Sequence, residues 1–350
     1  MGDAEAGALL AAEFVGGFCG AMASGWLGRR WTLLTALRAG LTLFALGLVG
    51  AAVAVKWWMP VCMLGCGFGL GVINPMANLI VSRASFPSPA AALNLFSFSW
   101  AAGALSTPFV IAFVLRFEPV AYVFAALAII TVVVALGATM VKTGEGSLEG
   151  ERASPQTNGE LRRGTTMFVV ITGVLLFLYV GVETGISVWL PTGTGRWLPV
   201  TASDAAASQS AFWGSLLLGR LLAPVWLRRI SPHALILAGL LCGAAGIAVF
   251  LIARSYGSVL VGVILAGLGL APVNPTIVAT FTRRLGSASA RWAGPVFASA
   301  ALGGASIPWA VGEVSSRLNS LRTGFVVPLL CIGSMFFLEL GLRSEPPQER

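Results

Sequence analysis

The chain alternates between long apolar runs and short polar connections. A run of about 20 apolar residues is the length that an α-helix needs to cross the hydrocarbon core of a bilayer. The pattern predicts eleven such helices, over residues 6–27, 31–55, 57–82, 88–115, 119–141, 165–190, 207–227, 233–253, 257–281, 292–315 and 323–342. The predicted fold class is therefore all-α, a polytopic membrane helix bundle.

Composition supports this prediction and excludes a soluble protein. Hydrophobic residues make up 57% of the chain and charged residues 10%, whereas soluble domains carry about 25% charged residues. The net charge of +8 does not indicate nucleic-acid binding, because most basic residues flank the apolar runs. Fourteen Lys and Arg residues lie on one predicted side of the bilayer and six on the other. The positive-inside rule therefore predicts a multi-pass protein of the cell inner membrane with a cytoplasmic C-terminus.

One polar segment divides the predicted helices into two groups. Residues 142–164 show no apolar periodicity, so they are interpreted as a cytoplasmic linker. Five helices precede this linker, in a bundle over residues 1–141, and six follow it, in a bundle over residues 165–350.

The two groups contain an internal repeat with an offset of 200 residues. GFGLGVINP over Gly67–Pro75 matches GLGLAPVNP over Gly267–Pro275, and the same offset continues into 88–115 and 292–315. Two pseudo-symmetric halves repeated in one orientation are the arrangement of major facilitator transporters. Residues 165–190 have no counterpart, because subtracting 200 leads to a position before residue 1. The repeat thus predicts that a first helix is missing, either because the chain is a fragment or because its start was assigned incorrectly. The alternative is a protein that functions with eleven helices.

Several segments resemble the fucose permease-like, sugar-transporting branch of the major facilitator superfamily. They include GWLGRRWTLL, ALNLFSFSWAAGALSTP, LYVGVETGISVWLP and GRLLAPVWLRR. The resemblance implies secondary transport by alternating access, with gating loops at Gly28, Arg29 and Arg30 and, in the second half, at Arg228 and Arg229. The first loop lacks the family's acidic residue. Asn74 stands where the fucose permease has an acidic residue associated with proton coupling, so that role cannot be carried over to position 74.

Inserting an ionisable side chain at membrane depth costs about 3 kcal/mol, so each such residue is expected to have a structural or functional role. Glu183 lies about five turns into the predicted helix 165–190, and we interpret it as the group that takes up a proton. The alternative is a structural ion pair, for which Arg220 on the next helix is the natural partner. Glu13 is a further candidate for coupling or for a charge pair, with helix-to-helix stabilisation as its alternative.

Neutral polar residues inside the predicted helices suit the binding of a sugar. Amides and hydroxyls exchange hydrogen bonds with sugar hydroxyls, and an indole covers a sugar's C–H face. The predicted substrate-binding residues are Asn74, Asn78, Asn94, Ser97, Trp100 and Asn274. Each asparagine can instead join helices to one another. Pro75 and Pro275 remove backbone hydrogen bonds at repeat-related positions, so a kink beside the cavity, and with it a break in the regular helix, is expected at both.

Other function classes lack their characteristic residues. The chain has a single histidine, His233, and it has no HExxH motif and no GxxxxGK[ST] loop, which argues against an enzyme and against a nucleotide-driven pump. Cys62 and Cys66 are one turn apart without further ligands nearby, so neither a metal nor a cofactor is expected. The predicted protein is a monomer that binds a small polar solute, protons and the bilayer, but no nucleic acid. Drug or metabolite export and a truncated, non-transporting membrane protein remain as alternatives.

Overall fold

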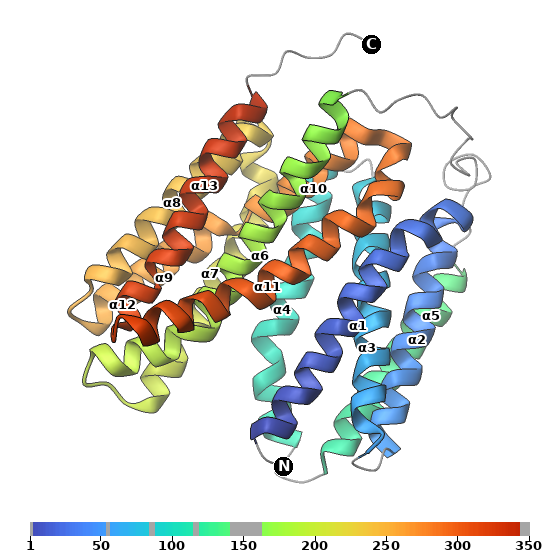
Figure 1. The fold of residues 1–350 in the computed structure, drawn as a ribbon, viewed down its shortest axis with the longest axis horizontal. Coiled ribbons are helices and arrows are strands. Elements are labelled where there is room, and N and C mark those ends of the chain that lie inside the picture. Colours follow the sequence, from blue (N-terminus) through green and yellow to red (C-terminus); the bar gives the residue numbers. More distant parts are fainter. Residues whose placement is uncertain (1–2, 54–56, 84–87, 115–118, 141–162, 344–350) are drawn as a thin grey trace. The chain divides into compact units, whose positions relative to one another are not determined.

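The computed structural model describes residues 3–53, 57–83, 88–114, 119–140 and 163–343, and these residues form helices joined by short connections (Figure 1). No strand occurs among them. In a bilayer every backbone N–H and C=O must find an internal partner, and an α-helix provides one within each span. The predicted all-α class is thus confirmed. The linker predicted at 142–164 lies almost wholly outside the described residues.

Contacts divide the chain into two compact units, each of which we describe by itself. The first comprises residues 1–83, 107–162 and 284–301, and the second comprises residues 84–106, 163–283 and 302–350. The boundaries cross three helices, since the chain passes from one unit to the other within α4 (Pro89–Val114), near the end of α10 (Val273–Leu285) and within α11 (Ser289–Arg317). The units therefore do not coincide with bundles at 1–141 and 165–350, and that division stays a prediction.

Unit 1 is built on a row of helices in which each packs against the next. α1 packs on α3, α3 on α2, and α2 on α5. The helices are α1 (Asp3–Arg30), α2 (Leu33–Val53), α3 (Met59–Ser82) and α5 (Val120–Met140), with the later part of α4 (Pro89–Val114) and the beginning of α11 (Ser289–Arg317).

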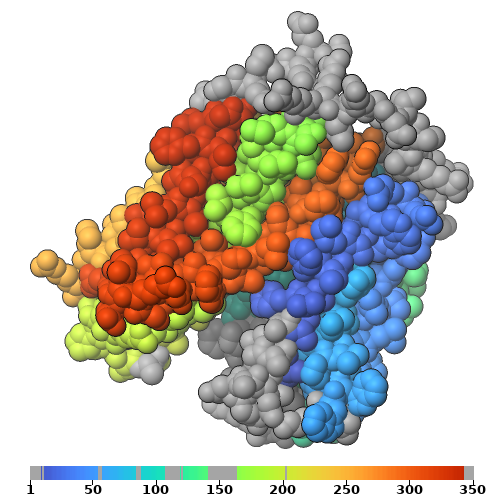
Figure 2. Space-filling view, viewed as in Figure 1, coloured from blue at the N-terminus to red at the C-terminus, as the bar shows by residue number. Residues whose placement is uncertain are grey.

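Unit 2 repeats this row at the offset of 200 residues. α7 packs on α9, α9 on α8, and α8 on α13, while α6 adds to the row by contacting α7 and α13. The α13 surface and the start of α6 adjoin each other in Figure 2. The helices are α6 (Arg163–Trp197), α7 (Ala202–Trp226), α8 (Pro232–Ile252), α9 (Tyr256–Leu270), α10 (Val273–Leu285), α12 (Leu321–Gly324) and α13 (Val326–Arg343).

The glycines of the repeated motif explain why the two rows are alike. A Cβ at Gly67 on α3 would collide with the Glu13 carbonyl on α1, and a Cβ at Gly267 on α9 would collide with Phe212 and Ser215 on α7. Two residues further along, Gly69 faces the backbone of α2 and Gly269 faces the backbone of α8. Each motif thus lets one helix approach two neighbours closely, as small residues do between membrane helices.

Large apolar side chains remain exposed on the outer helices of both rows. Ile129 and Val133 on α5 are 65% and 61% exposed, and Leu330 and Phe337 on α13 are 66% and 73% exposed. Apolar surface of this extent is typical of helices that face lipid. Seven helical stretches among the described residues are long and apolar enough to cross a bilayer, and the other spans of the predicted eleven stay predictions.

The predicted span 257–281 is interrupted, and the interruption is not at Pro275. α9 ends at Leu270 and α10 begins at Val273, so the break lies at Ala271 and Pro272. Pro272 has no N–H to continue the hydrogen-bond ladder of α9, which accounts for this position. In the first half, α3 runs through Pro75 as one helix. The helix break predicted at Pro275 thus lies at Ala271 and Pro272 instead, and the kink predicted at Pro75 stays a prediction.

Candidate functional site

The charged pair predicted on consecutive helices of the second half forms inside unit 2. Arg220 on α7 donates a hydrogen bond of 2.8 Å from Nη2 to Oε1 of Glu183 on α6. The side chains are 3% and 13% exposed respectively. Removing either partner would leave a buried charge without compensation, so the pair couples the two helices strongly.

Arg220 also connects the pair to a third helix. Its Nη1 donates 3.1 Å to the main-chain carbonyl of Ser97 on α4, in the part of α4 that belongs to unit 2. Arg220 Nε has no hydrogen-bond partner among the described residues. Because this N–H donor is unoccupied, the guanidinium can form a new hydrogen bond when its contact with the carboxylate changes.

Tyr179 links the pair to the broken helix. Its hydroxyl donates 3.0 Å to the carbonyl of Leu270, the last residue of α9, and lies 3.5 Å from Glu183 Oε1. The break at Ala271 and Pro272 frees this carbonyl from the helical ladder, and the Tyr179 hydroxyl satisfies it. Tyr179 is fully buried. Sequence reasoning missed it, although its spacing of four residues from Glu183 places both on one face of α6.

The same face of α6 carries a further polar residue that the sequence analysis missed. Ser187, four residues after Glu183, accepts hydrogen bonds at Oγ from Gln209 Nε2 at 3.1 Å and from Trp213 Nε1 at 2.8 Å, both on α7. Tyr179, Glu183 and Ser187 therefore form a polar stripe along α6, which faces polar residues of α7. The spacing of four residues was the available signal, but Tyr179 and Ser187 carry no charge, so neither stood out among the residues at membrane depth.

Asn94 on α4 is the predicted substrate-binding residue that lies deepest in unit 2. It is fully buried, and its Nδ2 donates to the Ala90 carbonyl at 2.8 Å and to Thr276 Oγ1 on α10 at 3.4 Å. Its Oδ1 accepts no hydrogen bond from any described residue. A buried amide oxygen without a donor is costly, and a hydroxyl group of a ligand would satisfy it.

The other predicted binding residues are distributed over both units. Ser97 contributes its carbonyl to Arg220, and Trp100 on the same helix is 61% exposed. Asn74 and Asn78 lie together on α3 in unit 1, where Asn78 Nδ2 donates 2.7 Å to Asn74 Oδ1. Asn274 is half-buried at the start of α10. Their roles in binding stay predictions.

Glu13 and the gating loops show no comparable network. Glu13 on α1 is half-buried, and no ion pair to it is found in the described part of the chain. The five gating-loop residues lie at the ends of α1 and α7: Gly28, Arg29, Arg30, Arg228 and Arg229. All four arginines are exposed, and Arg30 stacks on the Trp26 ring at 4.9 Å.

The family of the chain follows from a match over most of its length. Residues 1–291 match the model described as Major Facilitator Superfamily. The chain belongs to the major facilitator superfamily. Members of this superfamily are multi-pass membrane transporters rather than enzymes, which agrees with the fold and with the apolar helices described above.

Two curated proteins are similar to about half of this chain. They are a putative glucose/galactose transporter of Helicobacter pylori, 28% identical over 182 residues, and a glucose/galactose transporter of Brucella abortus, 25% identical over 177 residues. The match covers 49% of this chain and 42% of each relative, so the matched region spans less than half of the relatives' length.

Solved superfamily structures share the fold over nearly the whole chain. A crystal structure of the E. coli fucose:proton symporter has a TM-score of 0.86 at 20% identity and covers 98% of this chain and 92% of that chain. The proton:xylose symporter XylE has a TM-score of 0.79 at 14% identity, with 97% and 87% covered. The resemblance stated from the sequence is confirmed at the level of the fold.

Proposed function

We propose that this superfamily member is a secondary transporter that moves a neutral sugar across the cytoplasmic membrane together with a proton. The observation that carries the proposal is the buried network of Glu183, Arg220 and Tyr179, which joins α4, α6, α7 and α9. The names of the two curated relatives and of the fucose and xylose symporters supply the substrate class, a hexose or a pentose, and the coupling to protons.

Glu183 is the proposed proton carrier. Its carboxylate is 13% exposed, so a proton can reach it, while the surrounding helices keep it from bulk water. Protonation removes the negative charge that attracts Arg220 Nη2, so the ion pair is lost and the remaining hydrogen bond to the neutral carboxyl oxygen is weaker. Because Arg220 also binds the Ser97 carbonyl on α4, protonation alters how α4, α6 and α7 are joined. Such a local change can bias the two states of alternating access.

The sugar is proposed to bind beside this network through neutral donors and acceptors. Asn94 supplies an unpaired acceptor, Oδ1, and Trp100, further along α4, presents an exposed indole. Asn274 remains a proposed contact from α10, and the binding roles of Asn74 and Asn78 on α3 of unit 1 stay predictions. The protein is proposed to act as a monomer with its C-terminus in the cytoplasm, the orientation that the arginine distribution favours.

A substrate screen tests the proposal. The purified protein is heated in detergent with single hexoses, pentoses and cationic amphiphiles, and its melting temperature is recorded. A neutral sugar is expected to raise the melting temperature, because a ligand that binds only the folded state stabilises it. Asn94→Ala should lose this effect. Stabilisation by the amphiphiles alone would contradict sugar transport and favour the exporter alternative.

A further inference from the structure

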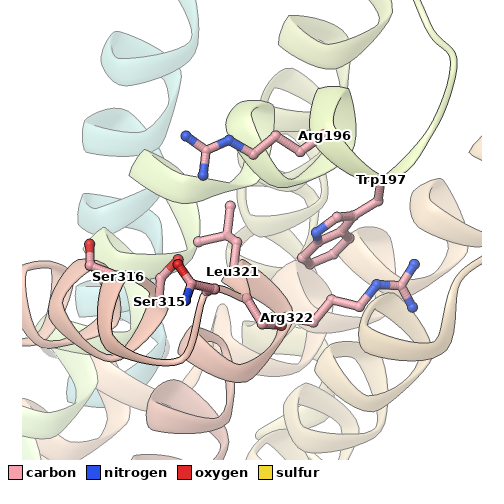
Figure 3. A pocket seen from close by; sticks show the side chains of 8 residues that line it. Arg196, Trp197, Ser315, Ser316, Leu321 and Arg322 are labelled. Atoms are coloured by element: carbon pink, nitrogen blue, oxygen red, sulfur yellow. The ribbon is translucent and has the colours of Figure 1, made fainter.

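A polar pocket of unit 2 lies beside the last turn of α6 (Figure 3). It is bounded by the last turn of α6, the end of α11 and the short helix α12, and its volume is about 470 Å³. Ligand pockets have volumes of about 300–1,000 Å³. Arg196 lies thirteen residues after Glu183 on α6, which is about 20 Å along the helix axis, so the pocket is separate from the network.

The backbone around the pocket is fixed by the way in which α11 ends. Asn319 has a φ of +48°, in the left-handed region. The Ser320 N–H donates 3.0 Å to the Ser315 carbonyl, and the Asn319 N–H donates 3.5 Å to the Ser316 carbonyl. These two bonds and the left-handed residue form a Schellman motif, the regular way to end a helix. The serines and the asparagine of the wall are thereby held in place.

The two arginines of the pocket differ in what they contact. Arg322 donates from Nη1 to the Leu251 carbonyl at 2.7 Å and from Nη2 to the Ala253 carbonyl at 3.0 Å. Its guanidinium also lies 4.8 Å from the centre of the Trp197 ring. Arg322 therefore binds the end of α8 and forms part of the wall, and its donors are largely occupied.

Arg196 has no such partner. It is exposed, and its guanidinium makes no hydrogen bond or ion pair with the described residues. In Figure 3 its guanidinium points away from that of Arg322 and toward the side where Ser315 and Ser316 lie. Ser315 is only 8% exposed, and its hydroxyl also makes no hydrogen bond with a described residue.

The pocket therefore has unused donors and a positive charge, but its lining contains no acidic residue. We propose that it binds an oxyanion carried beside hydroxyl groups, with Arg196 holding the carboxylate or phosphate and the serine hydroxyls and Asn319 contacting the neighbouring hydroxyls. This chemistry occurs in a soluble sugar acid and in the headgroup of phosphatidylglycerol. A guanidinium suits either oxyanion because its N–H groups match two oxygens at once.

Thermal unfolding of the purified protein tests this site without a transport assay, and so independently of the proposed function. The soluble arm compares D-galacturonate with neutral D-galactose in detergent. The lipid arm compares nanodiscs of phosphatidylglycerol with nanodiscs of phosphatidylcholine. Arg196→Gln is the test variant, and Arg254→Gln is the matched control, because Arg254 is also exposed and lies at the same end of unit 2 but does not line the pocket.

One anionic probe should raise the melting temperature of the unaltered protein and of Arg254→Gln. Arg196→Gln should bind that probe about tenfold more weakly, as expected for the loss of a charged hydrogen bond. An effect of galacturonate alone identifies a soluble sugar acid, and an effect of phosphatidylglycerol alone identifies a lipid headgroup. Equal binding by Arg196→Gln and Arg254→Gln would overturn the proposal and leave Arg196 as a cation at a helix end. An equal response to galactose, or no response to either anion, would also overturn it.

Discussion

Arg220 and Glu183 meet at 2.8 Å between α7 and α6, with the arginine only 3% exposed. A single substitution in such a pair leaves the remaining charge buried and unpaired, which lowers the free energy of unfolding by about 3–5 kcal/mol. We expect Arg220→Gln to lower the melting temperature in detergent strongly. The double variant Glu183→Gln with Arg220→Gln should be more stable than Arg220→Gln alone, because no charge is then left unpaired. Additive losses in this double-mutant cycle would show that the two side chains do not depend on each other.

Tyr179 should matter through its hydroxyl rather than its ring. Tyr179→Phe leaves the Leu270 carbonyl at the end of α9 without the donor at 3.0 Å, at an expected cost of about 1–3 kcal/mol. Tyr122→Phe is the control, since Tyr122 is 58% exposed. Thermal unfolding of the two variants under identical conditions provides the measurement. If both variants melt at the same temperature, the hydroxyl does not support the break.

Gly65 and Gly67 on α3 are two positions apart, but substitution by alanine should change the stability of the protein differently at each. A Cβ at Gly67 would meet the backbone of α1, whereas a Cβ at Gly65 would meet nothing within 4 Å. Gly67→Ala should therefore destabilise the protein by about 1–3 kcal/mol, and Gly65→Ala should be neutral or stabilising by up to about 1 kcal/mol. The melting temperatures of the two variants, measured in the same detergent, test this difference. Equal destabilisation would argue against close packing of α1 on α3.

His233 joins the start of α8 to α13 through its Nδ1, 2.5 Å from Glu339 Oε1. Glu339 is 2% exposed, so its carboxylate depends on this contact. His233→Ala should lower the melting temperature, and adding Glu339→Gln should restore part of the loss, because a neutral amide tolerates burial better than an unpaired charge. No recovery in the double variant would mean that His233 acts by packing alone.

The sequence predicted the helices and their repeat, because length and apolar composition determine membrane spans almost without regard to tertiary contacts. Partners between helices were harder to predict. The structure pairs Glu339 with His233, 106 positions away in the sequence, and no local spacing indicates this contact. The break between α9 and α10 lies at Ala271 and Pro272 rather than at Pro275. Neutral residues such as Tyr179 and Ser187 were missed because only their contacts with α7 and α9 distinguish them from ordinary helix residues.

Sugar accumulation in proteoliposomes tests the role of Glu183 most directly. Vesicles containing the protein are given a proton gradient, and uptake of the radiolabelled sugar identified in the substrate screen is followed, with exchange of labelled for unlabelled sugar measured in parallel. Glu183→Gln should abolish accumulation above the external concentration and leave exchange intact. Glu313→Gln, which alters an exposed carboxylate paired with Arg317, should accumulate sugar like the unaltered protein. Full gradient-driven accumulation by Glu183→Gln would contradict the proposal that Glu183 carries the proton.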